Sequence, residues 1–221
     1  MREPDPYEHG GRSGWNANEE DKMESTFFAA ISRMKYIERW ALMRSSRAEN
    51  LSEHSLEVSM IAHVLCLIGN VRYGKNYNAD RAAVIGLYHD ATEIITGDMP
   101  TPVKYYNEKI RESYKELENI AEYKLLNRLP DDLREEYRDI LLTPKNASEE
   151  EAALRRLVKA ADKLSAYIKC IEEENAGNKE FATAKVTLKK ALDKYAAELP
   201  EVRDFIEDFL PSYGKTLDEL S

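Results

Sequence analysis

Apolar residues recur at steps of three and four along nearly the whole chain from Met23 onward, and this spacing most restricts the possible folds. Phe27, Ile31 and Met34, for example, fall on one face of a helix. No segment has the two-residue alternation of a half-buried strand. The 221 residues include only 9 glycines and are 43% hydrophobic, which is enough for a packed core. The sequence therefore predicts an all-α protein with a single helical domain.

Capping residues, glycines and prolines bound the predicted helices. Their ranges are 23–39, 50–69, 78–97, 103–129, 132–142, 148–177, 180–199 and 202–210. Asn50 or Ser52 is suited to cap the second helix and Asn78 the third, while Ser148 and Glu151 have the spacing of a capping box. On the second helix we expect one apolar face to point inward. Its members are Leu56, Met60, Val64 and Leu67.

The first 22 residues differ from the rest in composition. They are rich in proline, glycine, asparagine and charge and have no apolar period, so they cannot bury enough surface to offset the entropy of ordering. We predict a flexible extension at residues 1–22 and the folded domain at residues 23–221. His9, which lies in the extension, is expected to be solvated.

The net charge of −9 restricts the partners. Both nucleic acid polymers and anionic membranes would repel such a chain. The N-terminus has no secretory signal pattern, and the longest apolar run, residues 60–68, is too short to span a bilayer. Cys66 and Cys170 form no CxxC motif and resemble core residues of a reducing compartment. We expect a soluble, cytoplasmic protein that binds neither membranes nor nucleic acid polymers.

Four residues on different predicted helices have side chains that ligate metals. His89 and Asp90 are adjacent, His54 stands in the first turn of an earlier helix, and Asp162 lies in an apolar stretch of a later one. A carboxylate in apolar surroundings costs several kcal/mol unless it is paired or bound to a metal. Two imidazoles with two carboxylates would suit Mn, Co, Fe, Ni or Zn better than Ca or Mg.

The order of these four residues resembles the His…His-Asp…Asp pattern of the HD-domain phosphohydrolases. The surrounding sequence resembles successive blocks of the bacterial 5′-deoxynucleotidases, at residues 31–35, 39–44, 49–55, 88–93, 96–105 and 160–167. The likeness covers most of residues 23–221 and is far more specific than a two-residue motif. It does not extend to residues 1–22, and residues 128–148 match poorly.

The resemblance implies a single-domain HD-domain helical bundle that forms a homodimer. The implied activity is hydrolysis of deoxyribonucleoside 5′-monophosphates to deoxynucleoside and phosphate. A divalent metal is implied, most often Co²⁺ or Mn²⁺, although the ligand types also allow Zn²⁺, Fe²⁺ or Ni²⁺. The family's ligands match His54, His89, Asp90 and Asp162. Its other active-site residues match Arg39, Trp40, Glu93 and Asp98.

The chemistry of a phosphomonoester suggests roles for these four other residues. Arg39 can hold a nonbridging phosphoryl oxygen through paired donors. Glu93 follows His89 by four residues, on the same helical face, and is assigned as general acid or proton shuttle. Asp98, in a turn stiffened by prolines, positions or deprotonates water, although the two roles could be exchanged. By resemblance, Trp40 lies near the sugar C2′ and excludes a 2′-hydroxyl. No residue evidently reads the base, so we expect broad base specificity.

The histidine count bears on the number of metal ions. Besides the two candidate ligands, the chain has only His9 and His63. His63 follows His54 by nine residues, which places it about half a turn away on an ideal helix. We therefore predict a single metal ion per chain.

Simpler interpretations exist for each residue taken alone. His54 could be a core or capping histidine, His89 and Asp90 an internal ion pair, and Asp162 half of a helix–helix ion pair. For the whole chain, two other functions remain open. One is a deoxynucleoside triphosphate hydrolase on the same fold, and the other is a non-enzymatic nucleotide- or metal-sensing helical module. The full set of ligands and candidate acid–base residues argues against the sensor.

Overall fold

The computed structural model describes residues 24–104, 106–144 and 146–221, and all regular secondary structure in these ranges is helical. The one β-type contact there is an isolated antiparallel bridge between Glu38 and Asn50. The predicted all-α class is therefore confirmed. Residues 1–22, predicted to be a flexible extension, lie outside the described residues.

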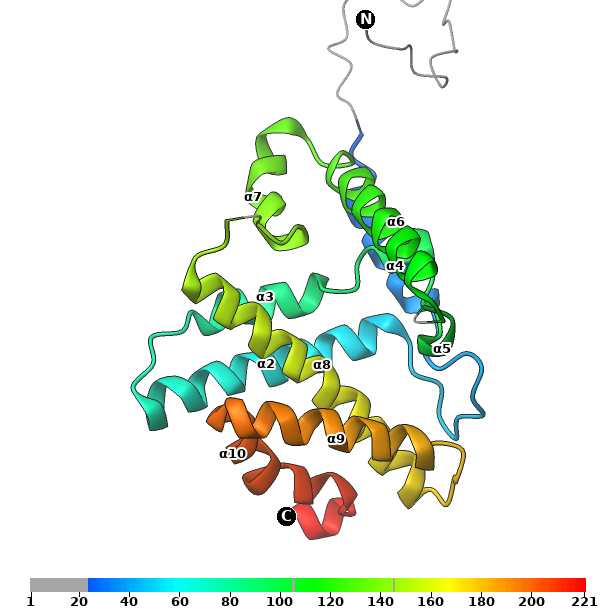
Figure 1. Ribbon diagram of the computed structural model, residues 1–221, viewed down its shortest axis with the longest axis vertical. Coiled ribbons are helices and arrows are strands. Elements are labelled where there is room, and N and C mark those ends of the chain that lie inside the picture. Colours follow the sequence, from blue (N-terminus) through cyan, green and yellow to red (C-terminus); the bar gives the residue numbers. More distant parts are fainter. Residues whose placement is uncertain (1–23, 105, 145) are drawn as a thin grey trace, which may run out of the picture.

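The elements follow one another along the chain without a repeat. They are α1 (Phe27–Ile31), the 3₁₀ helix η1 (Ser32–Tyr36), α2 (Leu51–Tyr73), α3 (Ala79–Tyr88), α4 (Glu93–Thr96), α5 (Thr101–Lys104), α6 (Glu108–Leu126), α7 (Asp131–Leu141), α8 (Glu149–Asn175), α9 (Ala182–Glu198), α10 (Pro200–Asp208), η2 (Leu210–Gly214) and η3 (Leu217–Leu220). Figure 1 shows α2, α3 and α8 at the centre, with α9 and α10 on one side and α6 and α7 on the other.

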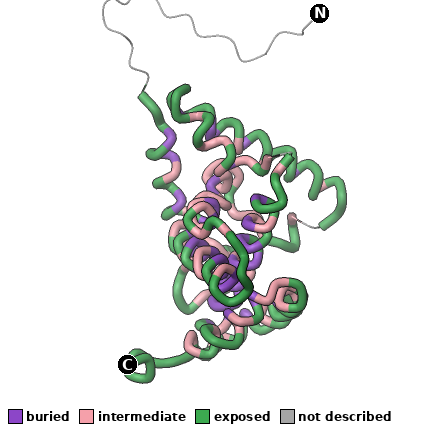
Figure 2. The backbone as a smooth tube through the Cα atoms, turned by 90° about the vertical axis from the view of Figure 1, so that its left-hand side faces the viewer, coloured by how far each residue is buried: buried purple, intermediate pink, exposed green. Residues whose placement is uncertain are grey.

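Two hydrophobic clusters build the interior. The larger one joins α2, α3 and α8 to α9 and α10, with Val58, Leu157 and Phe205 among its buried members. The contact between α2 and α3 is very close, because a Cβ added at Gly86 would lie 2.9 Å from the Cα of Ser59. In Figure 2 the buried residues gather along this central packing.

The second cluster joins the N-terminal helices to α6 and α7, and it includes Phe27, Leu125 and Ala91. Ile85 on α3 belongs to the first cluster, whereas Ala91, six positions later, belongs to the second. The segment between them therefore passes from one core to the other. His89 and Asp90 lie in this segment, at the junction of the two cores.

The predicted helix at 78–97 is wrong as a single element. α3 ends at Tyr88, and α4 begins only at Glu93. The amides of Ala91 and Glu93 bond to the carbonyls three residues earlier, at 3.0 Å each, which makes a tight turn. The apolar period continues through this turn because it is nearly helical, so the spacing alone could not reveal the break.

Other predicted boundaries also differ. The helix at 23–39 is shorter, since α1 and η1 end at Tyr36 and Ile37 is extended. The helix at 50–69 continues past Gly69 to Tyr73, where the left-handed Gly74 ends it. The helix at 103–129 is interrupted before Glu108, and Ser148 caps α8 without the predicted capping box. There, the carboxylate of Glu151 accepts hydrogen bonds from Arg81 and Arg155.

The predicted inward face of α2 is also wrong. The side chains of Leu56, Met60 and Leu67 are 53%, 58% and 41% exposed, respectively. The opposite face, which carries His54, Val58 and Leu65, is buried against α3 and α8. α2 is apolar on both sides, so the spacing alone could not determine which side is buried.

α2 is also long and apolar enough to cross a membrane, judged by length and composition alone. However, 56% of its most apolar window is buried inside the molecule. A helix that is mostly covered by its own chain is typical of the core of a soluble protein. α2 therefore packs as a core helix of this fold.

Candidate active site

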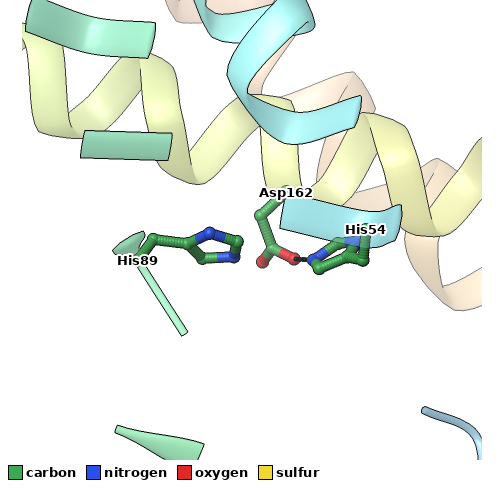
Figure 3. A group of neighbouring side chains, drawn as sticks. All are labelled: His54, His89 and Asp162. Carbon is green, nitrogen blue, oxygen red and sulfur yellow. Dashed lines mark ion pairs between the residues drawn. The ribbon is translucent and has the colours of Figure 1, made fainter. Parts of the chain in front are cut away.

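Three segments bring the four candidate ligands together. His54 stands in the first turn of α2, His89 and Asp90 follow α3, and Asp162 lies in the middle of α8. Figure 3 shows His89 and His54 on either side of Asp162, and the ligand atoms of these three residues lie within 4.8 Å of one another. The Nε2 atom of His54 is 3.2 Å from Oδ1 of Asp162 and 3.7 Å from Oδ2 of Asp90. The Nε2 atom of His89 is 3.1 Å from Oδ2 of Asp90.

The donor atoms fit a divalent transition metal. Nδ1 of His89 lies 2.7 Å from the carbonyl oxygen of Gly86, to which it can donate, so Nε2 is the ring nitrogen left to face the site. The Nε2 atoms of both histidines are buried, and each lies within 3.2 Å of a carboxylate oxygen. Adjacent ligands of a metal bound at about 2.1 Å lie about 3 Å apart. The distances His54–Asp162 and His89–Asp90 match that spacing.

The charges of the site are strongly coupled. Burial alone would raise the pKa of Asp90, but His89 lowers it to about 2. Burial opposes ionisation of Asp162 too, yet His54, Lys163 and His89 hold its pKa well below the usual value. Burial would lower the pKa of His89, but Asp90 and Asp162 raise it to about 9. These carboxylates are thus ready to bind a cation, whether an imidazolium or a metal ion.

Arg39 and Trp40 lie beside this cluster and share one support. Nη1 of Arg39 is 3.3 Å from Oδ2 of Asp90, and its Nε is 3.2 Å from Oε2 of Glu49. The indole Nε1 of Trp40 donates to the same oxygen of Glu49 at 2.9 Å. The ring of Trp40 packs edge-on against Phe181, with centroids 5.2 Å apart. One carboxylate oxygen of Glu49 therefore contacts both the guanidinium of Arg39 and the indole of Trp40.

The backbone at Trp40 is strained. Its φ of 60° is the only positive value of a non-glycine residue in the described ranges. Such a conformation costs of order 1–3 kcal/mol and persists only where the surroundings enforce it. Here the amide of Arg39 bonds to the carbonyl of Glu49 at 2.9 Å, which closes the loop between them. The strained conformation turns the indole toward Glu49 and Phe181.

Glu93 and Asp98 supply two further carboxyl groups. Oε2 of Glu93 is buried without a hydrogen-bond partner in the described part of the chain. Burial, followed by the charges of Asp90 and Asp98, raises the pKa of Glu93 to about 9. Burial also raises the pKa of Asp98, although Arg39 and a backbone hydrogen bond from Trp40 oppose this. Glu93 therefore holds a proton at neutral pH and can give it up.

A cavity of about 500 Å³ adjoins the cluster, with His89, Asp90 and Asp162 in its wall. Ile85, Leu141 and Val158 contribute apolar surface to it. Its basic lining residues are Arg155, Arg156 and Lys159. The cavity has room for a small organic molecule next to the candidate metal ligands.

His63 lies away from this site. Its Nε2 is 3.8 Å from the exposed Asp80, and it is not part of the ligand group. The sequence interpretation assigned no role to Glu49 and Ser165, which contact site residues, or to Glu57, which accepts a hydrogen bond from Ser165. Glu57 follows His54 by three residues and Ser165 follows Asp162 by three, so helical spacing could have indicated the last two.

Comparisons with known proteins identify the family and the fold of this chain. A family model described as 5′-deoxynucleotidase YfbR-like matches residues 26–213. A 5′-deoxynucleotidase of Vibrio vulnificus is 50% identical over 200 residues, which cover 90% of this chain and 99% of that relative. A 5′-deoxynucleotidase of Erwinia tasmaniensis is 50% identical over 199 residues, covering 90% of this chain and 98% of the relative.

Solved structures show the same fold. An HD-domain phosphohydrolase of Listeria innocua superposes with a TM-score of 0.71 at 24% identity, over 85% of this chain and 88% of that one. An HD phosphohydrolase of cyanophage S-2L, solved with dA and one catalytic Zn²⁺ ion, superposes with a TM-score of 0.58 at 19% identity, over 85% of this chain and 96% of that one. The resemblance inferred from the sequence is thereby confirmed, and the chain belongs to the YfbR-like 5′-deoxynucleotidase family with the HD-domain phosphohydrolase fold.

Proposed function

We propose that this enzyme hydrolyses deoxyribonucleoside 5′-monophosphates to deoxynucleoside and phosphate. The catalytic domain is assigned to residues 23–221. Relatives at 50% identity are named 5′-deoxynucleotidases, which supports the reaction. The observation that carries the proposal is the meeting of a four-ligand cluster with an arginine and a protonated carboxyl group. These are the groups that phosphomonoester hydrolysis requires.

His54, His89, Asp90 and Asp162 would hold one divalent metal ion per chain. When bound, the metal neutralises charge on the phosphoryl oxygens. We favour Co²⁺ or Mn²⁺, and the nitrogen and oxygen donors also suit Zn²⁺, Fe²⁺ or Ni²⁺. A single ion is supported by the position of His63 on another side of α2, paired with Asp80.

Arg39 binds the phosphate in this proposal. Burial would lower the pKa of its guanidinium, but Asp90, Glu49, Asp162 and Asp98 raise it, so the group stays charged. Its contacts with Asp90 and Glu49 fix its plane at the edge of the ligand cluster. A guanidinium held in this way can donate two parallel hydrogen bonds to a phosphoryl oxygen pair.

Glu93 and Asp98 move the protons. The departing 5′-alkoxide is strongly basic and must be protonated, and Glu93 carries a proton at neutral pH because burial raises its pKa to about 9. Asp98 sits beside Arg39 and the Trp40 backbone, where it can orient the attacking water and contact the substrate. The opposite assignment of the two roles remains the alternative.

Trp40 selects for deoxyribose. The left-handed backbone at Trp40, the Glu49 hydrogen bond and the Phe181 contact keep the indole in one position. A rigid flat ring next to the sugar C2′ would clash with a 2′-hydroxyl and thereby exclude ribonucleotides.

The active form is proposed to be a cytoplasmic homodimer. Leu56, Met60, Leu67 and Val71 form an exposed apolar stripe along α2. Isolated apolar side chains on a surface are ordinary, but a stripe along one helix indicates a partner surface. A second copy of this chain is the partner that the family resemblance implies.

One assay tests the proposed reaction. The purified protein with Co²⁺ or Mn²⁺ is offered dAMP, AMP, dATP and a generic phosphomonoester, and the products are identified. Phosphate release from dAMP with little from AMP is the expected result. Tripolyphosphate release from dATP would instead support the triphosphate hydrolase. The structure does not favour that alternative, because Arg155 and Arg156 in the cavity are already paired with Glu151 and Glu198.

A further inference from the structure

A chain of hydrogen bonds leads away from the metal site on the far side of the His54 ring. His54 is fully buried, and its Nδ1 atom lies 2.9 Å from Oγ of Ser165 on α8. Ser165 is also fully buried, and its hydroxyl lies 2.6 Å from Oε2 of Glu57 on α2. These two hydrogen bonds therefore connect His54 on α2 to Ser165 on α8, and Ser165 to Glu57 on α2.

The directions of these hydrogen bonds follow from the chemistry of the groups. Above its pKa the carboxylate of Glu57 is ionised and can only accept, so the single hydroxyl proton of Ser165 goes to Glu57. The Ser165 oxygen can then only accept at its other contact, and Nδ1 of His54 must carry the proton that fills it. In a neutral imidazole this leaves Nε2 without a proton.

The unprotonated Nε2 faces the candidate metal site. It lies 3.2 Å from Oδ1 of Asp162 and 3.7 Å from Oδ2 of Asp90. A lone pair that faces two carboxylates is repelled unless a cation lies between them. The hydrogen bonds to Ser165 and Glu57 thus favour the tautomer of His54 whose Nε2 can bind a metal.

We infer that Ser165 and Glu57 are positioning residues that hold His54 in its metal-binding tautomer. The inference rests on the metal site proposed above. Burial raises the pKa of Glu57 to about 7, and the hydroxyl of Ser165 opposes this, so the carboxylate is ionised in mildly alkaline solution.

Two variants break the chain at different points. Ser165→Ala removes the acceptor for Nδ1. Glu57→Leu removes the acceptor for the serine hydroxyl, which can then rotate and donate to Nδ1, stabilising the wrong tautomer. Glu57→Gln keeps an amide oxygen that can accept from Ser165 and should retain most of the function. Ser55→Ala is the matched control, since Ser55 is buried next to His54 and its hydroxyl has no partner in the described ranges.

The first measurement is the tautomer of His54 in the metal-free protein, read from its ring nitrogen signals by ¹⁵N NMR above the pKa of Glu57. The wild type, Glu57→Gln and Ser55→Ala are expected to carry the proton on Nδ1. Ser165→Ala and Glu57→Leu are expected to populate the form with the proton on Nε2. A wild-type ring protonated on Nε2 would overturn the inference.

The second measurement is the affinity for Co²⁺, obtained by titration against a competing chelator. Loss of a partner behind a metal-binding histidine weakens binding on the order of 10- to 100-fold, and we expect this for Ser165→Ala and Glu57→Leu. Unchanged affinity and tautomer in both variants, or an equal loss in Ser55→Ala, would overturn the inference. If either Ser165→Ala or Glu57→Leu fails to fold, the tautomer and the Co²⁺ affinity of the other variant test the inference.

Neither measurement uses the substrate. A protein that shows the expected tautomer and metal affinities but does not hydrolyse dAMP would refute the proposed reaction and leave the role of Ser165 and Glu57 standing. Conversely, dAMP hydrolysis with an unaltered tautomer in Ser165→Ala and Glu57→Leu would refute only this inference.

Discussion

Single residues in the site are kept in states that they would not adopt in water. Glu93 stays protonated because it is buried beside Asp90 and Asp98, and Trp40 is held in a left-handed backbone conformation. Each state costs stability that the surrounding packing must supply. In the proposed reaction these states would provide a proton donor and a rigid steric barrier, so stability and activity should change in opposite directions when these residues are altered.

The variant Glu93→Gln should lose activity and gain stability. Without its proton, kcat should fall by about 10²- to 10⁴-fold. In the metal-free wild type, folding raises the pKa of Glu93 from 4.5 to about 9, so the unfolded state binds fewer protons in this range and stability falls as pH rises. Glutamine does not titrate, so the variant does not lose stability in this way. Its free energy of unfolding should exceed that of the wild type by on the order of 2 kcal/mol near neutral pH.

Urea denaturation of metal-free wild type and Glu93→Gln at several pH values checks this linkage. The difference between the two proteins should be small at pH values below the ordinary pKa of glutamate and should grow as the pH rises toward about 9. A difference that is constant across this range, or a variant with full activity, would contradict the role of Glu93.

The variant Trp40→Ala should relax sugar selectivity. The ratio of kcat/KM for dAMP over AMP is expected to fall on the order of 10- to 100-fold, because the barrier to a 2′-hydroxyl is removed. Tyr36→Ala is the control, since Tyr36 is a nearby aromatic residue that is 68% exposed. An unchanged ratio in Trp40→Ala would assign the selectivity to another residue.

At the scale of elements, the position of the site depends on how α2, α3 and α8 meet. The close approach of α3 to α2 brings the end of α3 next to His54, and the turn at 89–92 then directs His89 and Asp90 inward. If α3 continued as a regular helix through residues 89–92, Asp90 would lie further along the axis of α3. His89 and Asp90 of the candidate metal site therefore lie in the break between α3 and α4.

The variant Gly86→Ala tests the close approach. Its Cβ would lie 2.9 Å from the Cα of Ser59, which is backbone and cannot move aside easily. We expect a loss of about 1–3 kcal/mol in the free energy of unfolding, measured by urea denaturation. Leu87→Ala, at a neighbouring residue that is 39% exposed, should cost less. Equal losses in the two variants would mean that the helices are not in tight contact.

At the scale of the whole molecule, two hydrophobic clusters share one site at their junction. A metal held by α2, α8 and the turn after α3 would join segments that are far apart in the sequence. The exposed apolar stripe on α2 lies on the opposite side of the same helix from His54. In our proposal, α2 thus contributes a metal ligand on one side and a dimer contact on the other.

The variant Met60→Glu should separate the proposed dimer into folded monomers. A charge buried in an apolar contact costs several kcal/mol, enough to shift the equilibrium at micromolar concentration. The mass in solution, measured by light scattering after size exclusion, checks this. Val186→Glu on α9, at a residue that is 57% exposed, should leave the mass unchanged. A monomeric wild type, or a dimer that survives Met60→Glu, would contradict the proposed interface.

The sequence by itself determined the helical class and the candidate ligands, because both depend on local spacing and residue type. The caps at Asn50, Asn78 and Ser148 were also predictable, since a cap bonds within its own first turn. Residue order and the flanking blocks indicated the family, and in the structure His54, His89 and Asp162 form one group of possible metal ligands, while Asp90 lies beside the two histidines without belonging to that group.

Only the tertiary structure decided the rest. Which apolar side of α2 is buried depends on α3 and α8, so spacing within α2 could not settle it. The break before Glu93 follows from the two cores between which the chain must pass. The hydrogen bonds of Glu49 to Trp40 and of Ser165 to Glu57 join residues brought together by folding. Long-range packing determines these contacts, and local sequence does not encode them.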